Sequence, residues 1–352
     1  MLIRLRKHLP EAEIQAILAA ADQMGFQARF LDRERELVEL SGPSRPDARS
    51  RLEDLAGVRD VLDAGESREL FARDPARRSS PHAGDSVVSV GQARFGAGHV
   101  SLIAGPCAVE GAERLIEIAL GVRERGATVL RGGAFKPRTS PYSFQGARHE
   151  GLEWLRRAKL ESGLPVVTEL LDPRDVDVVG EIADMFQIGS RNMANTPLLS
   201  EVGRTRKPVL LKRGFAANLR ELLLAAEFVL AGGNENVVLC ERGIRGFDPN
   251  TRNVLDVGAV AHLKRATHLP VIVDPSHAAG RPDLVRALAR AGLAAGADGV
   301  ICEVHTHPYE VHCDGHQAIS LEEFARLTAD ARAIAALDGR RLVTDSAQET
   351  VS

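Results

Sequence analysis

Apolar and polar positions follow two different rhythms along this chain. In the first 70 or so residues, short alternating runs are interrupted by two stretches with apolar residues three or four positions apart. The first pattern predicts strands and the second predicts helices. The predicted elements are a strand at 2–6, a helix at 10–24, strands at 27–31 and 37–41, a helix at 47–55 and a strand at 58–62. This βαββαβ order predicts a ferredoxin-like module.

The module contains no acid–base or nucleophile grouping, so we expect it to bind an effector or a partner rather than to catalyse. Residues 72–85 are rich in Arg, Ser, Pro, Asp and Gly, which is typical of a linker. Two apolar runs, 86–90 and 92–95, flank Gly91 and predict a hairpin. We therefore expect a regulatory domain at 1–72, and a linker with a hairpin at 73–98.

From residue 99 onward, short apolar runs alternate with helical stretches of about 12–18 residues. The predicted strands are 100–104, 127–131, 165–169, 184–188, 208–212, 236–240, 270–274 and 298–303. Eight βα units in about 240 residues predict a (β/α)8 TIM barrel at 99–340, followed by a polar tail at 341–352. A doubly wound open sheet is the alternative, and the lack of a dinucleotide-binding glycine motif weakens it.

Composition narrows the function classes. The net charge of −3 and the aromatic content of 4% argue against a nucleic-acid partner. No apolar run approaches the length of about 18 residues that spans a membrane, and residues 1–7 lack the apolar core of a signal peptide. A cytoplasmic location is therefore the expectation. Four widely spaced cysteines argue against a disulfide framework or a structural zinc site: Cys107, Cys240, Cys302 and Cys313.

In a TIM barrel, functional residues follow the carboxyl ends of the strands. The segment 131–140 follows the second predicted strand and holds three cations, two glycines and a proline. It is either an anion-binding loop or a solvated basic loop. Nearly every predicted strand end carries a charge, a thiol or an imidazole. This regularity favours a functional mouth.

Two groups of side chains are expected at this mouth. The first is cationic and would repel itself strongly unless anions lay among its members, so it suits two phosphorylated or carboxylated substrates. Its members are Arg131, Lys136, Arg138, Arg191, Lys212 and Arg242. The second is a mixed set of metal ligands that follows the first, seventh and eighth strands, which are neighbours in a closed barrel. Its members are Cys107, His277, Glu303 and Asp314.

The mixed ligand set suits a borderline divalent metal such as Mn, Fe, Co or Zn, which would polarise a carbonyl. Cys107 alone would be interpreted as a small buried hydrophobe. The last loop of the barrel is rich in histidine. These residues either form a second metal site or belong to a solvated loop, and a solvated loop is the commoner case. These residues are His305, His307, His312, Cys313 and His316.

The strand-end motifs together resemble those of the 3-deoxy-D-arabino-heptulosonate 7-phosphate (DAHP) synthases. The resemblance is to the short type I-beta form, whose relatives include the 3-deoxy-D-manno-octulosonate 8-phosphate synthases. It covers essentially the whole barrel, and regulated members carry a ferredoxin-like module as well. The matching motifs are Ile-Ala-Gly-Pro-Cys at 103–107, the segment 131–146 with its Lys-Pro-Arg-Thr core, Gly-Ser-Arg-Asn at 189–192, Leu-Leu-Lys-Arg-Gly at 210–214, Leu-Cys-Glu-Arg-Gly-Ile-Arg at 239–245 and Val-Asp-Pro-Ser-His at 273–277.

The resemblance implies condensation of phosphoenolpyruvate with erythrose 4-phosphate, with release of phosphate, as the first step of the shikimate pathway. It implies one divalent metal ion on Cys107, His277, Glu303 and Asp314. It places Arg131, Lys136 and Lys212 around the phosphoenolpyruvate carboxylate, and Arg191 and Arg242 on its phosphate.

The remaining implied roles concern the aldose and the chemistry. Arg138 and Thr139 would hold the aldose phosphate. Asp274 would bind its hydroxyl near the metal, and Glu169 would lie near the attacking water. Lys136 would protonate or stabilise the developing alkoxide. We further expect an aromatic amino-acid effector and a homotetramer.

Differences from the relatives refine these expectations. The octulosonate synthases have Lys-Ala-Asn-Arg where this chain has Lys136-Pro137-Arg138-Thr139, so the four-carbon acceptor is favoured. Ala108 stands where serine is usual. The loop before Asp314 is rich in histidine, unlike that of most relatives, so the sequence supports Asp314 as a ligand less strongly than the other three. Two other readings remain. One is a metal-dependent aldolase for other phosphorylated substrates, and the other is a non-catalytic sensor of sugar phosphates.

Overall fold

The computed structural model describes residues 2–6, 8–32, 37–42, 47–62, 70–72, 84–137, 142, 145–308 and 317–344. The chain divides into two compact units, Met1–Leu70 and Phe71–Ser352. Three of the expected site residues, Arg138, Thr139 and Asp314, lie outside the described residues, as does the expected tail beyond residue 344. None of the helices in the described ranges is long and apolar enough to cross a membrane.

The first unit is a four-stranded antiparallel sheet with two helices. Its elements are β1 (Leu2–Leu5), α1 (Glu11–Gln23), β2 (Gln27–Asp32), β3 (Leu37–Ser41), α2 (Ala48–Glu53) and β4 (Val58–Leu62). The strand order β2-β3-β1-β4 confirms the predicted ferredoxin-like fold. Alternate strand residues such as Ile3, Leu5 and Val38 are buried and pack against Ile17 of α1 and Leu52 of α2.

The second unit is a closed parallel barrel. Its strands are β7 (His99–Gly105), β8 (Val129–Arg131), β9 (Val166–Glu169), β10 (Met185–Ile188), β11 (Val209–Lys212), β12 (Val237–Glu241), β13 (Val271–Val273) and β14 (Gly299–Glu303). Each pairs in parallel with the next, and β14 pairs with β7 from Gly299 opposite Ser101 to Glu303 opposite Gly105. This closure confirms the barrel and removes the open-sheet alternative.

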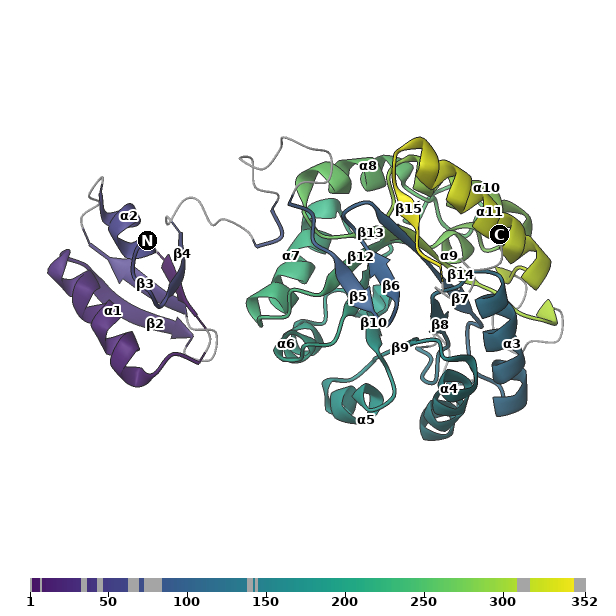
Figure 1. Ribbon diagram of the computed structural model, residues 1–352, viewed down its shortest axis with the longest axis horizontal. Helices are drawn as coiled ribbons and strands as arrows, with labels where there is room; N and C mark the ends of the chain where they lie inside the picture. The colour runs from purple at the N-terminus through teal and green to yellow at the C-terminus, as the bar shows by residue number, and fades with distance from the viewer. Residues whose placement is uncertain are drawn as a thin grey trace. The chain divides into compact units, whose positions relative to one another are not determined.

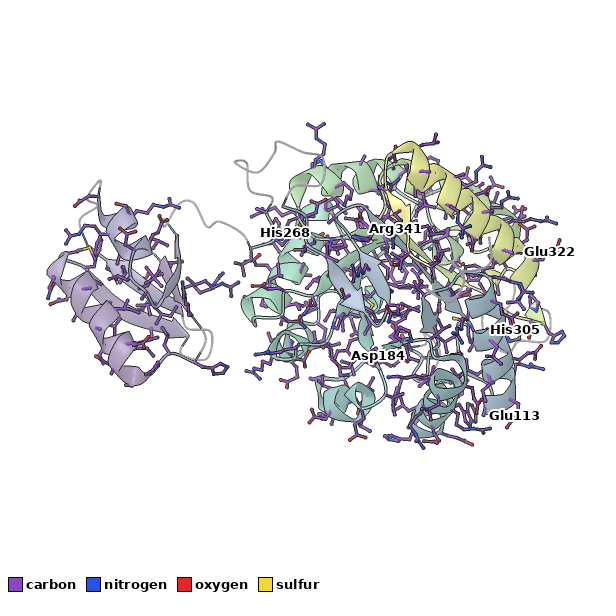
Figure 2. All side chains as sticks on the ribbon, viewed as in Figure 1. Glu113, Asp184, His268, His305, Glu322 and Arg341 are labelled. Atoms are coloured by element: carbon purple, nitrogen blue, oxygen red, sulfur yellow. The ribbon has the colours of Figure 1, made fainter. Side chains whose placement is uncertain are left out.

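Helices surround the barrel strands on the outside (Figure 1). They are α3 (Ala112–Glu124), α4 (Arg148–Ser162), α5 (Val176–Gly180), α6 (Thr196–Arg204), α7 (Leu219–Ala231), α8 (Val257–Ala266), α10 (Pro282–Ala294) and α11 (Leu321–Leu337). Their outer faces carry solvated charges, for example Glu113 on α3 and Glu322 on α11 (Figure 2). Side-chain caps at Asn195, Asn218 and Ser320 satisfy N–H groups where three of these helices begin.

A hairpin closes the end of the barrel at which the strands begin. It consists of β5 (Val88–Val90) and β6 (Ala93–Phe95), close to the predicted ranges. Its apolar side chains form one core with at least one residue from every barrel strand, such as Ile103 of β7 and Ile301 of β14. Because this end is sealed by apolar packing, the polar strand ends form the opposite, open end.

A short strand near the end of the barrel was not predicted from the sequence. Arg341–Leu342 form a short strand, β15, that pairs in parallel with β7 through His99 and Val100. The start of the expected polar tail is therefore attached to the barrel. A two-residue strand is too short to produce a readable period.

Candidate active site

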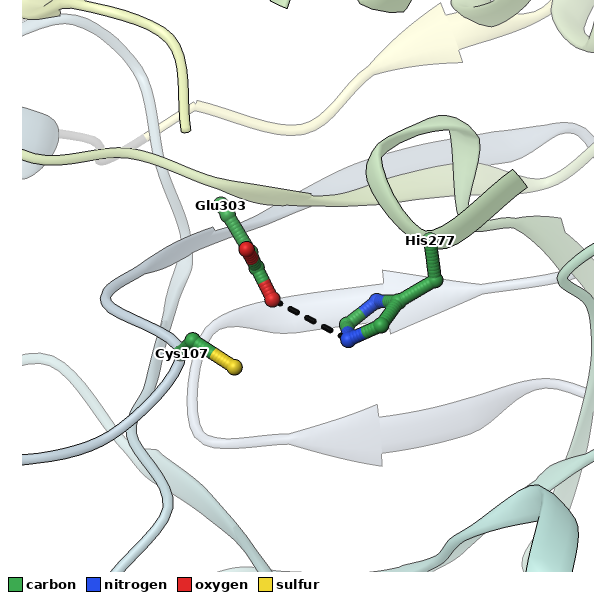
Figure 3. A group of neighbouring side chains, drawn as sticks. All are labelled: Cys107, His277 and Glu303. Atoms are coloured by element: carbon green, nitrogen blue, oxygen red, sulfur yellow. Dashed lines mark ion pairs between the residues drawn. The ribbon is translucent and has the colours of Figure 1, made fainter. Parts of the chain in front are cut away.

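Three side chains that could hold a metal ion meet at the mouth of the barrel. Cys107 follows β7, His277 lies in the short helix α9 (Pro275–Ala279) after β13, and Glu303 ends β14. Their ligand atoms all lie within 4.8 Å of one another (Figure 3). His277 Nε2 is 3.0 Å from Glu303 Oε1. A sulfur, an imidazole nitrogen and a carboxylate oxygen in this arrangement fit a borderline divalent metal ion.

Local sequence explains how His277 reaches this position. Asp274 caps α9 by accepting a hydrogen bond from the backbone N–H of His277, 3.1 Å away, and Pro275 starts the helix. Gly280 then ends α9 in the left-handed conformation, with φ of 69°. The single helical turn directs the imidazole towards the end of the neighbouring strand.

Polar groups behind the triad orient two of its members, His277 and Glu303. Asp274 Oδ2 accepts from His277 Nδ1 at 2.7 Å and from Lys212 Nζ at 2.5 Å. With Nδ1 engaged in this way, Nε2 is the nitrogen left for a metal. The family resemblance implies that Asp274 binds the substrate, but the contacts of both its oxygens are to protein groups. A substrate contact therefore stays a prediction.

Two of the residues behind the triad were missed. Gln317 Nε2 donates to Glu303 Oε2 at 2.8 Å, and Arg252 Nη1 donates to Gln317 Oε1 at 3.1 Å. Gln317 is fully buried, although glutamine is usually exposed. Its position between the last predicted strand and the last helix was the available signal. Its amide and Arg252 lock the orientation of the Glu303 carboxylate.

Opposite charges in the site shift the pKa values of His277 and Glu303 in opposite directions. Burial alone would lower the pKa of His277, but the carboxylates of Asp274 and Glu303 outweigh it and raise the pKa to about 9. Burial would raise the pKa of Glu303, but His277 and Arg131 outweigh it and lower the pKa. The carboxylate is therefore ionised at neutral pH, while the metal-free imidazole is protonated.

We expect metal binding to be pH-dependent. A metal must displace the proton of His277, so the apparent affinity for Mn²⁺ should rise at least about tenfold for each unit between about pH 6 and 8. Competition between the metal-free protein and a fluorescent chelator measures this dependence. In Asp274→Asn, which removes the charge that raises the pKa of His277, the dependence should shift to lower pH. An affinity that stayed constant over this range would contradict the assignment of His277 as a ligand.

Cationic groups lie directly beside the ligands. Lys136 Nζ is 3.1 Å from Cys107 Sγ, and Arg131 Nη2 is 3.4 Å from Glu303 Oε1. Arg131 is buried, and its Nη1 atom has no hydrogen-bond partner among the described residues. A buried donor without a partner costs about 1–3 kcal/mol, which an anionic ligand would offset. Cys107, Arg131 and Lys136 line a small cavity together with Glu169 and Gln187.

Two glycines make this crowding possible. A Cβ atom on Gly133 would lie 2.7 Å from the carbonyl oxygen of Cys107. A Cβ atom on Gly189 would lie 1.9 Å from Glu169 Oε1. Close approach, rather than a positive φ, is therefore the role of the glycine at 133, since its backbone is not left-handed.

Two further expected residues share one aromatic neighbour. Arg191, in a short 3-10 helix after β10, and Arg242, after β12, both face the ring of Phe215, with Cζ atoms 5.3 and 4.7 Å from its centroid. Burial, followed by the charge of Arg252, lowers the pKa of Arg242. In the histidine-rich segment, His305 is buried and its Nδ1 accepts from the N–H of His307, while 309–316 fall outside the described ranges. No second group of three metal-binding side chains occurs among the described residues.

The fold and the site define a TIM-barrel protein whose mouth combines a triad that could hold a metal ion with a group of neighbouring cations. Residues 80–335 match the family model described as the DAHP synthetase I family. The chain belongs to this family.

Comparison with individual proteins and solved structures supports the same family assignment. The chain is 42% identical over 336 residues to a phospho-2-dehydro-3-deoxyheptonate aldolase of Thermotoga maritima, covering 95% of this chain and 98% of the relative. The crystal structure of a DAHP synthase from Thermotoga maritima matches with a TM-score of 0.74 and 41% identity, over 97% of this chain and 98% of that one. A 2-dehydro-3-deoxyphosphooctonate aldolase of Nitratidesulfovibrio vulgaris is 34% identical over 67% of this chain and 92% of its own length.

Proposed function

We propose that this chain is a DAHP synthase, which condenses phosphoenolpyruvate with erythrose 4-phosphate at the open end of the barrel. The observation that carries the proposal is that the cations expected to bind an anion lie directly against the triad that could hold a metal ion. Lys136 Nζ lies 3.1 Å from the thiol sulfur of the triad, and Arg131 Nη2 lies 3.4 Å from its carboxylate. A metal-bound carbonyl and an anion held by these cations would therefore be in contact.

Phosphoenolpyruvate is held by its two anionic groups. The unpartnered Nη1 of Arg131 binds the carboxylate, assisted by Lys136 and Lys212. Arg191 and Arg242 bind the phosphate. Holding both ends fixes C3 of the enol towards the triad, which supplies much of the rate enhancement by orientation alone.

A divalent metal ion on Cys107, His277 and Glu303, with Asp314 as a further ligand, would supply a Lewis acid for the aldehyde of the acceptor. The mixed ligand set favours Mn, Fe, Co or Zn. C3 of phosphoenolpyruvate forms the new bond to the aldehyde carbon. Lys136 delivers a proton to the aldehyde oxygen, which becomes a hydroxyl group.

Water then completes the reaction at C2 of the former phosphoenolpyruvate. Glu169 accepts a proton from this water as its oxygen bonds to C2. The new hydroxyl group on C2 then loses its proton as the C2 carbonyl forms, the bond between C2 and the phosphate-ester oxygen breaks, and inorganic phosphate leaves with the electron pair and takes up that proton. The products are DAHP and phosphate, so one water is consumed for each condensation.

The choice of acceptor follows from the relatives and from one motif. The similarity to the heptonate enzyme covers both units, whereas the similarity to the octonate enzyme covers 67% of the chain. Pro137 and the two residues after it, Arg138 and Thr139, favour the aldose phosphate with four carbons. The octonate relatives make the five-carbon acceptor the second candidate. Phosphate release with erythrose 4-phosphate should exceed that with arabinose 5-phosphate at least tenfold in kcat/KM, and the reverse preference would select the second candidate.

The ferredoxin-like unit supports a regulatory role, with an aromatic amino acid as effector in a homotetramer. A truncated Thermotoga maritima DAHP synthase with a solved structure matches 78% of this chain with a TM-score of 0.69, which supports a barrel that folds without the first unit. Removal of residues 1–70 is expected to abolish inhibition by tyrosine or phenylalanine while leaving catalysis. Inhibition that persisted unchanged would exclude this unit as the effector site. The homotetramer and the cytoplasmic location stay predictions.

A further inference from the structure

Three guanidinium groups surround the ring of Phe215. The Cζ atoms of Arg191, Arg242 and Arg245 lie 5.3, 4.7 and 5.5 Å from its centroid. Phe215 follows β11, while the arginines follow β10 and β12, the strands on either side of it. One ring is therefore the common neighbour of cations from two other strand ends.

This arrangement concentrates positive charge. Because all three Cζ atoms lie close to one point, no two are more than about 11 Å apart, which is near the screening length at 0.1 M salt. Among the described residues, Arg242 and Arg245 make no ion pair with a carboxylate, and the one hydrogen bond of the Arg242 side chain goes to the carbonyl oxygen of Gly243, 3.4 Å away. The ring faces attract the cations, but they do not neutralise them.

The backbone holds Arg245 in this place. Its N–H donates to the carbonyl oxygen of Phe215 at 2.7 Å. The preceding residue, Ile244, exchanges two backbone hydrogen bonds with Val254. Arg245 is thus carried by a fixed segment, although its side chain is exposed.

We propose that Arg245 is a third phosphate-binding residue and that Phe215 is the positioning residue that gathers the three guanidinium groups. The proposal rests on the proposed function, in which Arg191 and Arg242 bind the phosphate of phosphoenolpyruvate. Buried Arg242 forms the floor of the site, and exposed Arg245 approaches the phosphate from the solvent side. Three planar donor groups suit the oxygens of a phosphate ester that carries two charges.

The phosphate could belong to either substrate, and kinetics distinguishes the two. Arg245→Gln is expected to raise the KM for phosphoenolpyruvate about tenfold or more, with kcat within about threefold and the KM for erythrose 4-phosphate within about twofold. Arg245→Lys should recover part of the loss. Arg204→Gln, which removes the same charge at the far end of α6, is the matched control and should behave like the unaltered protein. A rise confined to the KM for erythrose 4-phosphate would overturn the assignment to phosphoenolpyruvate.

Direct binding tests Phe215. Calorimetry on the full chain with phosphoenolpyruvate alone should show weaker binding in Phe215→Leu, which keeps an apolar side chain but removes the ring. Phe228→Leu, on the outside of α7, is its control. In the double variant, the effect of Arg245→Gln should shrink, because the two residues act through one contact. Fully additive effects would overturn the positioning role.

Binding titrations combined with the phosphate-release assay distinguish failure of the arginine site from failure of the proposed function. If the unaltered chain binds phosphoenolpyruvate in an Arg245-dependent way but releases no phosphate with erythrose 4-phosphate, the proposed function fails and the arginine site stands. If the chain is fully active and Arg245→Gln binds phosphoenolpyruvate with unchanged affinity, the arginine site fails and the proposed function stands.

Discussion

Replacing Cys107 by alanine is expected to lower kcat by at least about 10³-fold, because a Lewis acid contributes several kcal/mol to such a reaction and each 1.4 kcal/mol is about tenfold in rate. Cys107 supplies the only sulfur of the triad, and Lys136 also contacts its Sγ atom. The loss should therefore appear together with loss of bound metal. Metal content by elemental analysis and phosphate release measure the two effects in the same preparation.

Cys240→Ala is the matched control for this variant. Cys240 is also a buried cysteine, but its side chain belongs to the apolar core of the barrel rather than to the triad. It should keep the metal and a rate close to that of the unaltered protein. A Cys107→Ala protein that kept both its metal and its rate would remove Cys107 from the site.

Replacing Lys136 by alanine is expected to lower kcat by at least about 10²-fold, the usual contribution of a positioned general acid. Lys136 is buried beside Cys107 and is the cation nearest to the triad's sulfur among the described contacts. Steady-state phosphate release gives the rate, and calorimetry with phosphoenolpyruvate gives the binding.

Lys136→Arg separates charge from proton transfer. Arginine keeps the positive charge but does not release a proton at neutral pH, so it should restore much of the phosphoenolpyruvate binding and little of the rate. Lys207→Ala, whose ammonium group contacts the carbonyl of Ala183 outside the mouth, is the matched control. A Lys136→Arg protein with a nearly normal rate would show that charge alone is required.

The sequence predicted the barrel well because buried parallel strands read as apolar runs. Val209–Lys212 and Val237–Glu241 are buried throughout and end on a charged residue, so both the strand and its functional end are visible in the pattern. The triad was predictable for a related reason. Strand closure brings the end of the eighth strand beside the first, so Glu303 and Cys107 must meet.

The pattern of apolar and polar residues does not predict side-chain contacts between different strand ends at the mouth of the barrel. Gln317 supports Glu303 from a loop, and Phe215 collects arginines from two other strand ends; nothing in the spacing of these residues indicates either contact. Gly189 likewise had no visible reason to be glycine until the Glu169 carboxylate was found against it. The roles of the site residues in substrate binding and catalysis stay predictions.

The most direct test of the proposed function measures phosphate released from phosphoenolpyruvate by the full chain after exhaustive chelation and after reconstitution with Mn²⁺. Erythrose 4-phosphate serves as the acceptor, and arabinose 5-phosphate is run in parallel. The proposed site predicts no release without metal, and recovery with metal that depends on erythrose 4-phosphate and yields DAHP and phosphate in equal amounts. Full activity in the chelated protein, or condensation without phosphate release, would contradict it.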